Sequence, residues 1–286
     1  MLPARLETDR LLLRQPEKAD AAAVRELMMQ EFVRRNNCFG LPLPLEAVEQ
    51  MLTSQPDQMV LTRKEDGAVI GHVSAQPDGL RYQVDAVSLS YYLGEAYARQ
   101  GYMTEAVGAV VKDVFYKTRT QVVSARSFVE NEGSVALLEK LGFTREGTLR
   151  RALPDSYGQM HDDMMFSLLR EEYLAAHPPR LGDVLSIKMD RPIGTVHPKH
   201  PDLIYPVNYG YVPGLMAPDG EEQDAYVLGV DQPLEEFTGQ LIAVIHRFDD
   251  VEEKWVLAPE GMDFTKEQVE EMTRFQEQYY QIEIRM

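Results

Sequence analysis

A β-prone run, a short Arg-Gln-Gly turn and an amphipathic helix pattern follow one another between residues 84 and 117. After the turn, apolar residues recur at helical spacing: Ala106, Val107, Val110, Val111, Val114 and Phe115. Glycine lets a backbone come close to an anion, and the first amides of a helix have no partner within that helix. The order of strand, Gly101 turn and helix therefore predicts a phosphate-binding turn in a domain that contains both strands and helices.

The size and composition fit a two-domain globular protein. A chain of 286 residues is long for one domain, and its apolar runs fall short of the roughly 20 residues that a membrane-spanning helix needs. The start of the chain lacks a secretion-signal pattern. The single cysteine, Cys38, excludes an internal disulfide and favours the cytoplasm. The net charge of −17 argues against nucleic acid and anionic membranes as partners.

Two prolines mark the expected domain border, because Pro178 and Pro179 cannot continue the helix expected before them. We expect a first domain over residues 1–177, a linker over 178–183 and a second domain over 184–286. Helical patterns dominate the first part, at residues 17–31, 44–54, 103–117 and 132–141. Short strands dominate the second, at residues 185–189, 204–213, 224–230, 240–248 and 254–258. The predicted fold is an α/β (α+β) domain with a central mixed sheet, followed by a small, mostly-β barrel.

One helix, from about Thr265 to Tyr280, is expected to close the chain. Thr265 and Gln268 have the spacing of a capping box at its start. In the first domain, Asn131 is expected to cap the helix after it, and Gly142 stands where a left-handed residue would end that helix.

The first domain resembles the GNAT acetyltransferases, in particular the subgroup of ribosomal-protein N-terminal acetyltransferases. The opening Leu6–Arg14 is similar to the family's first strand, and Asn131–Phe143 is similar to its second signature, Asn-x-x-Ser followed by a helix that ends in Gly-Phe. His161–Ser167 is similar to the last strand. The Gly101 turn resembles the family's coenzyme A pyrophosphate loop.

This resemblance implies an acetyl-CoA-dependent N-acetyltransferase. The diphosphate would rest on backbone amides of residues 99–104, which are Arg99, Gln100, Gly101, Tyr102, Met103 and Thr104. The pantetheine arm would lie between the strand ending near Leu93 and the strand 121–127. An amide near Tyr92 or Leu93 would polarise the thioester carbonyl. The acceptor would be an amine, on a small molecule or a protein N-terminus.

The acid that protonates the departing sulfur is less clearly encoded. Many GNAT enzymes use a tyrosine where this chain has Leu138, and members near this subgroup use the serine of Asn-x-x-Ser. The resemblance therefore gives Ser134 as the candidate acid, with Asn131 in the same motif. An ordinary polar residue in the first helical turn is the competing interpretation of Ser134. Asp155 and Glu146 are weak candidates for the base, and Glu105 is expected to serve the start of its helix.

The second domain resembles the soluble family I inorganic pyrophosphatases, whose barrel is OB-like. The resemblance rests on residues 205–213, 219–224 and 249–254, with Asp190-Arg191 before them and 275–280 after them. It implies Mg²⁺ ligands at Asp219, Glu221, Asp224 and Asp250. It implies phosphate contacts at Arg191, Tyr209, Lys254 and Tyr279. Residues 197–200 are expected to form a loop, in which Lys199 is an alternative phosphate contact. The family's second carboxylate is Glu221 here, and a family lysine is replaced by Tyr280.

Three functions stay open on the sequence. The first is N-acetyltransfer by the first domain, fused to a pyrophosphatase-like domain. The second is Mg²⁺-dependent hydrolysis of pyrophosphate or another phosphoanhydride as the main activity. The third is a non-catalytic second domain that binds phosphate or metal and regulates or dimerises the chain, so that a homodimer is among the expected assemblies.

Overall fold

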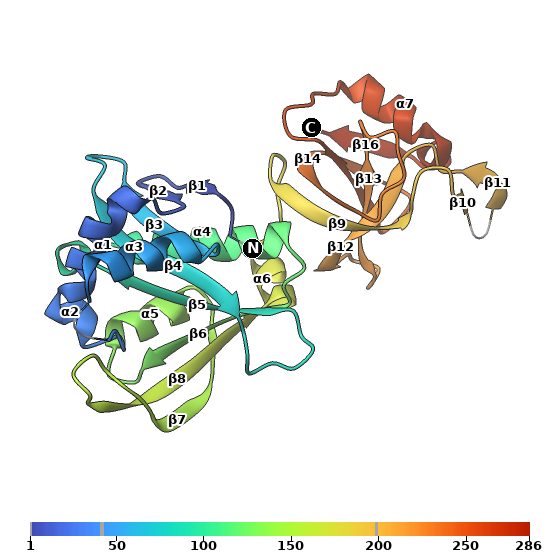
Figure 1. Ribbon diagram of the computed structural model, residues 1–286. Coiled ribbons are helices and arrows are strands. Elements are labelled where there is room, and N and C mark those ends of the chain that lie inside the picture. Colours follow the sequence, from blue (N-terminus) through green and yellow to red (C-terminus); the bar gives the residue numbers. More distant parts are fainter. Residues whose placement is uncertain (1, 41–42, 198–199) are drawn as a thin grey trace. The chain divides into compact units, whose positions relative to one another are not determined.

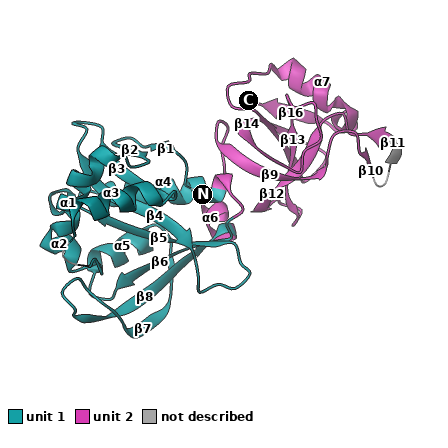
Figure 2. Cartoon of the chain, viewed as in Figure 1, with its two compact units in different colours: residues 1–115, 120–170 teal, residues 116–119, 171–286 magenta. Residues whose placement is uncertain are grey.

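The computed structural model describes residues 2–40, 43–197 and 200–286, with the side chains of 200–202 left aside. The chain divides into two compact units, one of residues 1–115 and 120–170 and the other of residues 116–119 and 171–286 (Figure 2). Each unit is described separately below. No helix among the described residues is long and apolar enough to cross a membrane.

Unit 1 is built on one eight-stranded mixed sheet (Figure 1). Its strands are β1 (Arg5–Glu7), β2 (Leu11–Arg14), β3 (Gln58–Arg63), β4 (Val69–Pro77), β5 (Ala86–Leu93), β6 (Val122–Phe128), β7 (Thr144–Pro154) and β8 (Met160–Leu169). Their order in the sheet is β1-β2-β3-β4-β5-β6-β8-β7. The pair β5–β6 is parallel, and the other neighbours are antiparallel. The expected mixed sheet is therefore confirmed.

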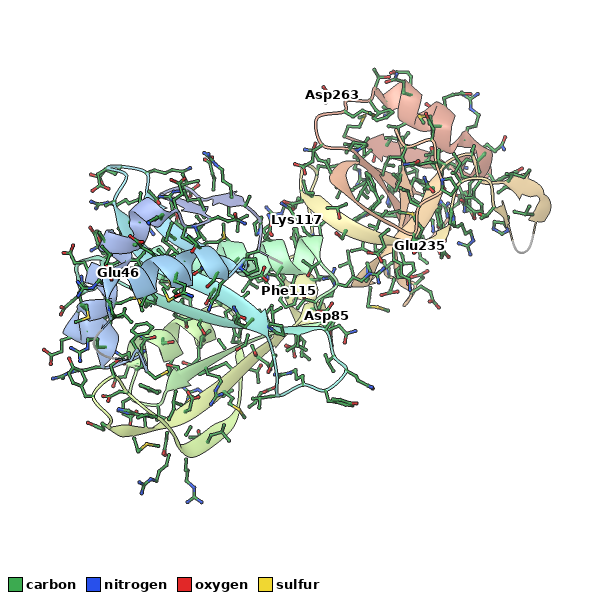
Figure 3. All side chains as sticks on the ribbon, in the orientation of Figure 1. Glu46, Asp85, Phe115, Lys117, Glu235 and Asp263 are labelled. Atoms are coloured by element: carbon green, nitrogen blue, oxygen red, sulfur yellow. The ribbon has the colours of Figure 1, made fainter. Side chains whose placement is uncertain are left out.

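Helices cover both faces of this sheet. They are η1 (Lys18–Asp20), α1 (Ala21–Met29), α2 (Glu31–Arg34), α3 (Leu45–Ser54), η2 (Glu95–Tyr97), α4 (Tyr102–Lys117) and α5 (Glu132–Lys140). Apolar residues of α1, α2 and α3 form one core cluster with Val60 and Tyr92 of the sheet. On α4, Val107, Val110, Val114 and Phe115 are fully buried, and Phe115 is labelled in Figure 3. The apolar spacing read from the sequence is thus the buried stripe of α4.

Unit 2 contains a closed barrel of five strands. They are β9 (Val184–Arg191), β12 (Asn208–Met216), β13 (Glu222–Val227), β14 (Glu236–Arg247) and β15 (Glu253–Ala258). The pairing runs β15-β13-β12-β9-β14 and returns from β14 to β15, so these five strands leave no free edge. The pair β13–β15 is parallel, and the other pairs in the ring are antiparallel. A mostly-β barrel is confirmed.

Further elements complete unit 2: α6 (Arg170–Ala176), β10 (Val196–His197), β11 (His200–Ile204), α7 (Lys266–Glu277) and β16 (Ile282–Arg285). The capping box of α7 is present, since Thr265 Oγ1 accepts from Gln268 N–H at 3.3 Å and Gln268 Oε1 accepts from Thr265 N–H at 2.8 Å. The single strand expected over 204–213 is instead divided between β11 and β12. Pro206 lies in the break and has no N–H to donate to a neighbouring strand.

Candidate functional site

The sheet of unit 1 opens between its two parallel strands. Residues 86–89 of β5 pair with residues 122–125 of β6, and the pairing stops there. Both strands continue past this point, β5 to Leu93 and β6 to Phe128, each still paired with its other neighbour. The edges that face each other beyond Leu89 and Ala125 are therefore not joined by ladder hydrogen bonds. An extended ligand can add to these edges as a strand would.

The hydrogen-bond pattern between β4 and β5 determines which β5 amides face this opening. Gly94 N–H donates to Ile70 O of β4 at 2.9 Å, and Tyr92 stands opposite His72 in the same antiparallel register. Alternate residues of a strand direct their backbone groups to opposite sides. The Tyr92 amide therefore points to β4, whereas the Leu93 amide points into the opening. Of the two amides expected to polarise a carbonyl, the geometry favours that of Leu93, because the Tyr92 amide belongs to the β4–β5 ladder.

The turn that leads into α4 lies at the end of β5 and η2. Gly101 has φ +81° and Arg99 has φ +59°, so two residues of the turn occupy the left-handed region. Within the described residues, the first backbone bond of the helix is Glu105 N–H to Gly101 O at 3.0 Å. The amides just before it belong to the unpaired first turn of a helix, where an anion is favoured. The left-handed turn and the unpaired helix amides thus lie where the sequence predicts a phosphate-binding turn.

Glu105 fastens this turn to the β1–β2 hairpin. Its carboxylate accepts from Thr8 Oγ1 at 2.5 Å, from Arg10 N–H at 2.9 Å and from Arg10 Nε at 2.7 Å. Burial alone would raise the pKa of Glu105, but the hydrogen bonds from Thr8 and Arg10 outweigh it and lower the pKa. Arg10 also donates from Nη1 to Gln100 O at 2.9 Å, and its guanidinium lies 4.4 Å above the Tyr102 ring. Glu105 therefore positions the turn rather than acting on a substrate.

The start of α5 lies next along the chain after β6. Asn131 Oδ1 accepts from Ser134 N–H at 3.2 Å, so Asn131 caps the helix, and Gly142 takes φ +87° after it. Ser134 Oγ lies 2.8 Å from the hydroxyl of Tyr91 on β5. Tyr91 was not among the residues predicted from the sequence. The available signal was its position in the strand before the Gly101 turn, two residues from Leu93, but its partner Ser134 lies 43 residues away.

The other face of β5 carries Tyr92 and an aromatic cluster. The His72 ring stacks on Tyr92 with centroids 5.3 Å apart, and Phe39 meets Tyr92 edge-on at 5.5 Å. Tyr92 is 8% exposed, and its hydroxyl has no hydrogen-bond partner among the described residues. Phe39 N–H donates to Ser156 Oγ at 3.0 Å, which ties the segment after α2 to the β7–β8 turn.

Burial of His72 makes the stability of unit 1 depend on pH. Its Nε2 lies 2.9 Å from Gln58 Oε1, and burial lowers the pKa of His72 from 6.5 to about 4. A folded pKa below the unfolded one means that the unfolded chain binds the proton first. The contribution of neutral His72 to the unfolding free energy of unit 1 is therefore intact above pH 6.5 and is lost as the pH falls toward 4. Between pH 7 and pH 5, wild type should lose about 2 kcal/mol more unfolding free energy than His72→Gln.

Urea unfolding of unit 1 at several pH values measures this difference. His246→Gln is a matched control, because the His246 side chain is 32% exposed and pairs with Glu253 at 3.0 Å. Equal pH slopes for wild type and His72→Gln would show that His72 does not carry the effect.

The carboxylates considered as bases have other partners. Glu146 pairs with Arg81 at 2.6 Å and accepts from Ser167 Oγ at 2.8 Å. Asp155 accepts from the amides of Tyr157 and Gln159 at 2.8 and 2.9 Å and lies 3.5 Å from His161 Nε2. Burial alone would raise the pKa of Asp155, and these backbone hydrogen bonds lower it. Both carboxylates thus hold local structure.

In unit 2, four of the residues chosen from the sequence come together. The Tyr209 ring centroid lies 5.6 Å from the Arg191 guanidinium and 5.9 Å from Lys254 Nζ. Lys254 is 2% exposed and forms ion pairs with Asp224 and with Glu252. Burial raises the pKa of Tyr209 well above its usual value, and the charge of Asp224 adds to the effect. The cluster thus holds two cations beside a buried tyrosine.

The other residues chosen in unit 2 lie apart from this cluster or have different partners. Tyr279 is 71% exposed. Asp219 accepts from the Glu221 amide at 3.0 Å within an exposed turn, and Asp250 pairs with Arg247 at 3.1 Å. Among residues 2–40, 43–197 and 200–286, no group of three or more His, Cys, Asp or Glu side chains could hold a metal ion. The Mg²⁺ prediction is therefore unsupported. Lys199 lies outside the described residues.

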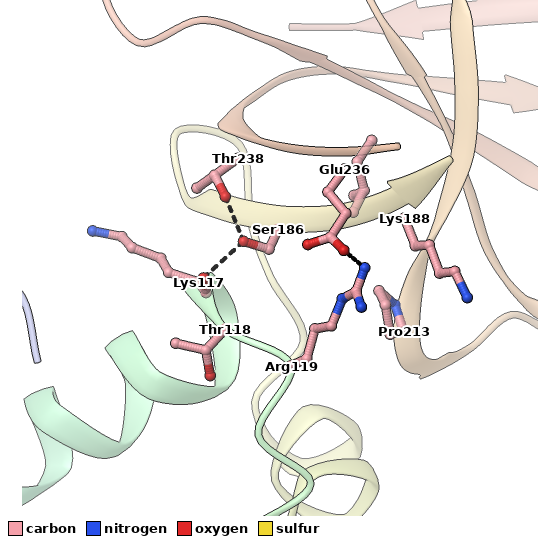
Figure 4. Close-up of a pocket in the computed structure, with 9 residues that line it drawn as sticks. Lys117, Thr118, Arg119, Ser186, Lys188, Pro213, Glu236 and Thr238 are labelled. Atoms are coloured by element: carbon pink, nitrogen blue, oxygen red, sulfur yellow. Dashed lines mark hydrogen bonds and ion pairs between the residues drawn. The ribbon is translucent and has the colours of Figure 1, made fainter. Parts of the chain in front are cut away.

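A shallow pocket lies within unit 2, away from the residues chosen above (Figure 4). Ser186 Oγ donates to Lys117 O at 2.8 Å and lies 2.5 Å from Thr238 Oγ1, while Arg119 pairs with Glu236. These bonds connect residues 117–119 with β9 and β14, all of which belong to unit 2.

Comparison with known proteins gives matches to the first part of the chain. The family described as acetyltransferase (GNAT) domain matches residues 10–144. An uncharacterized N-acetyltransferase of Bacillus subtilis, YoaA, is 26% identical over 176 residues, which are 58% of this chain and 96% of that protein. The uncharacterized N-acetyltransferase p20 of Bacillus licheniformis is 30% identical over 126 residues, or 43% of this chain and 67% of p20.

Among solved structures, a ribosomal-protein-S5-alanine acetyltransferase from Vibrio fischeri superposes with a TM-score of 0.53. The match is 20% identical and covers 60% of this chain and 99% of that one, so it supports the fold alone. The comparisons give no support to the pyrophosphatase resemblance.

Proposed function

We propose that this chain, which belongs to the GNAT acetyltransferase family through residues 10–144, transfers the acetyl group of acetyl-CoA to an amine by direct attack. The observation that carries the proposal is the opening between β5 and β6, with the Gly101 turn and the first turn of α4 at the end of β5. An extended arm can pair with the strand edges while its diphosphate meets unpaired amides. The family relation supports acetyl-CoA as the donor.

The binding roles follow from the direction of the backbone groups. Amides from Arg99 to Thr104 hold the diphosphate, with Gln100, Tyr102 and Met103 acting through the main chain. The Leu93 amide points into the opening and stabilises the oxygen that becomes negative as the amine attacks. Asn131 holds the first turn of α5, so that Ser134 faces the departing sulfur as its acid.

Binding of acetyl-CoA is the first test. Calorimetry should give a saturable heat with acetyl-CoA, and the cofactor should raise the melting temperature more than AMP does, because AMP lacks the pantetheine arm and the diphosphate. Release of free CoA in the presence of a panel of amines and peptides then identifies the acceptor. No heat and no shift at saturating acetyl-CoA would refute the proposal.

A second candidate function concerns unit 2, and the convergence of Arg191 and Lys254 on Tyr209 favours it. Two cations within 6 Å of one tyrosine ring centroid could together attract phosphate oxygens. The closed five-stranded barrel followed by α7 also agrees with an OB-like, pyrophosphatase-like domain. Hydrolysis would require Mg²⁺ at Asp219, Glu221, Asp224 and Asp250. Among the described residues no group of three or more His, Cys, Asp or Glu side chains is placed to hold a metal ion, so we rank phosphate binding above catalysis; phosphate would have to displace the carboxylates of Asp224 and Glu252 from Lys254.

Phosphate release from pyrophosphate with added Mg²⁺ separates these alternatives. Turnover that Asp219→Asn and Asp224→Asn abolish would establish a hydrolase. Phosphate or pyrophosphate binding that Lys254→Met weakens about tenfold, without turnover, would establish a binding module. If neither turnover nor binding is observed, the barrel is a structural domain.

Three smaller proposals concern the whole chain. We keep the domain border at residues 178–183, supported by the end of α6 at Ala176 and the prolines that follow, although the compact units place residues 171–177 with the second unit. We assign the protein to the cytoplasm, supported by its single exposed free thiol, Cys38. A homodimer is tested by light scattering of the full chain.

A further inference from the structure

One side-chain hydrogen bond joins β5 to α5, the helix that follows β6. The Tyr91 hydroxyl, on β5, lies 2.8 Å from Ser134 Oγ, in the first turn of α5. Both ends are held by regular structure. Residue 91 pairs with Val73 of β4, and Asn131 accepts from the Ser134 N–H. The two oxygens are therefore fixed relative to each other by the sheet and by a helix cap.

Tyr91 stands at the part of β5 that no longer pairs with β6. Its side chain lies on the face opposite Tyr92, because neighbouring residues of a strand point to opposite faces. Burial raises the pKa of Tyr91 to about 12, although the hydrogen bond with Ser134 acts in the opposite direction. The phenol thus keeps its proton at neutral pH and can donate it to Ser134.

We propose that Tyr91 and Ser134 form a relay of two hydroxyl groups that delivers a proton to the sulfur leaving the acetyl group. The inference rests on the proposed acetyl-CoA reaction. As the amine nitrogen bonds to the carbonyl carbon and the carbon–sulfur bond breaks, Ser134 Oγ gives its proton to sulfur and takes one from the Tyr91 hydroxyl. The proton lost by the amine goes to solvent, and solvent returns one to the Tyr91 phenolate.

Two hydroxyls serve this step better than one. A serine hydroxyl is a weaker acid than a phenol, so Ser134 alone would leave an unstable alkoxide. A donor behind Ser134 moves the negative charge to the tyrosine ring, and hydrogen bonds in a chain strengthen one another. Ser134 is the catalytic residue here because it faces the sulfur, and Tyr91 is a positioning residue that acts through it.

The test uses CoA itself, so that it needs no acceptor amine. The thiol of CoA bound to the full chain is titrated by the ultraviolet absorbance of its thiolate, for wild type, Tyr91→Phe, Ser134→Ala and the double variant. The relay stabilises the thiolate, so the bound thiol should titrate about 0.5 to 1 pH unit higher in each variant than in wild type. The double variant should shift no further than Ser134→Ala, because Tyr91 acts only through Ser134.

Tyr116→Phe is the matched control, since it removes a tyrosine hydroxyl that donates to His177 O at 3.0 Å and lies near the opposite end of α4 from Gly101. It should leave the thiol titration at the wild-type value. Bound CoA that titrates alike in wild type, Tyr91→Phe and Ser134→Ala would overturn the relay while leaving acetyl-CoA binding intact. Failure of wild type to bind CoA would overturn the proposed function and the relay together.

Discussion

Replacing Gly101 by valine is expected to weaken acetyl-CoA binding about 100-fold, the largest effect on function that we anticipate from one substitution. Gly101 has φ +81°, where a β-branched residue is strained, so the turn must change its path. A new path redirects the amides at the start of α4, and each hydrogen bond to a charged group contributes about 1.5–3 kcal/mol. Calorimetric titration with acetyl-CoA measures the loss.

Gly67→Val is the matched control for this substitution. Gly67 also has a left-handed backbone, with φ +74°, and a Cβ there would meet no atom within 4 Å. It lies in the β3–β4 turn, so valine brings similar strain without touching the turn before α4. Gly101→Ala should weaken binding less, because its Cβ would lie 3.4 Å from Arg10 Nη2, the movable end of a side chain. Equal affinities for the Gly101→Val and Gly67→Val proteins would exclude the turn as the diphosphate site.

Much of the fold was predictable because it is encoded locally. The apolar positions of α4, the Asn131 cap, the left-handed Gly142 and the capping box at Thr265 each involve residues within a few positions of one another. Such signals need no knowledge of the tertiary structure. The phosphate turn belongs to this class, since Gly101 and the helix after it are adjacent in sequence.

The features that could not be predicted from the sequence depend on pairing between segments that are distant in the chain. The choice of Leu93 over Tyr92 required the register of β4 with β5, and the partner of Ser134 required the packing of α5 beside β5. In unit 2, the carboxylate of Asp224 suggested a metal ligand. Its ion pair with Lys254, 30 residues away, became visible only once β13 and β15 were paired.

Unit 2 also contains a buried ion pair that the sequence did not predict. Arg247 and Glu277 are 2% and 1% exposed, and their side chains form two hydrogen bonds of 2.8 and 2.6 Å. The Tyr226 hydroxyl donates to the same carboxylate at 2.5 Å, and the Tyr280 ring lies 3.8 Å from the guanidinium. Glu277 ends α7 and Arg247 ends β14, so the pair attaches the closing helix to the barrel.

Glu277→Gln should lower the unfolding free energy of unit 2 by about 3 kcal/mol. The substitution keeps the shape of the side chain and removes its charge, which leaves the buried guanidinium with the weaker contacts to Asp250 at 3.1 Å and Glu252 at 3.4 Å. A buried charge without full compensation is costly, because its desolvation is no longer offset. Urea unfolding of the full chain, followed by the fluorescence of Trp255 on β15, measures the change in unit 2.

The exposed pair on the same helix separates this effect from a general loss of helix charge. Glu271 and Arg274 lie 2.7 Å apart and are more than half exposed, so Glu271→Gln should change stability by less than about 1 kcal/mol. The double variant Arg247→Met/Glu277→Leu removes both buried charges at once and should recover most of the stability lost in Glu277→Gln. If it is instead as unstable as the single variant, the packing of these side chains, and not the uncompensated charge of Arg247, holds α7 to the barrel.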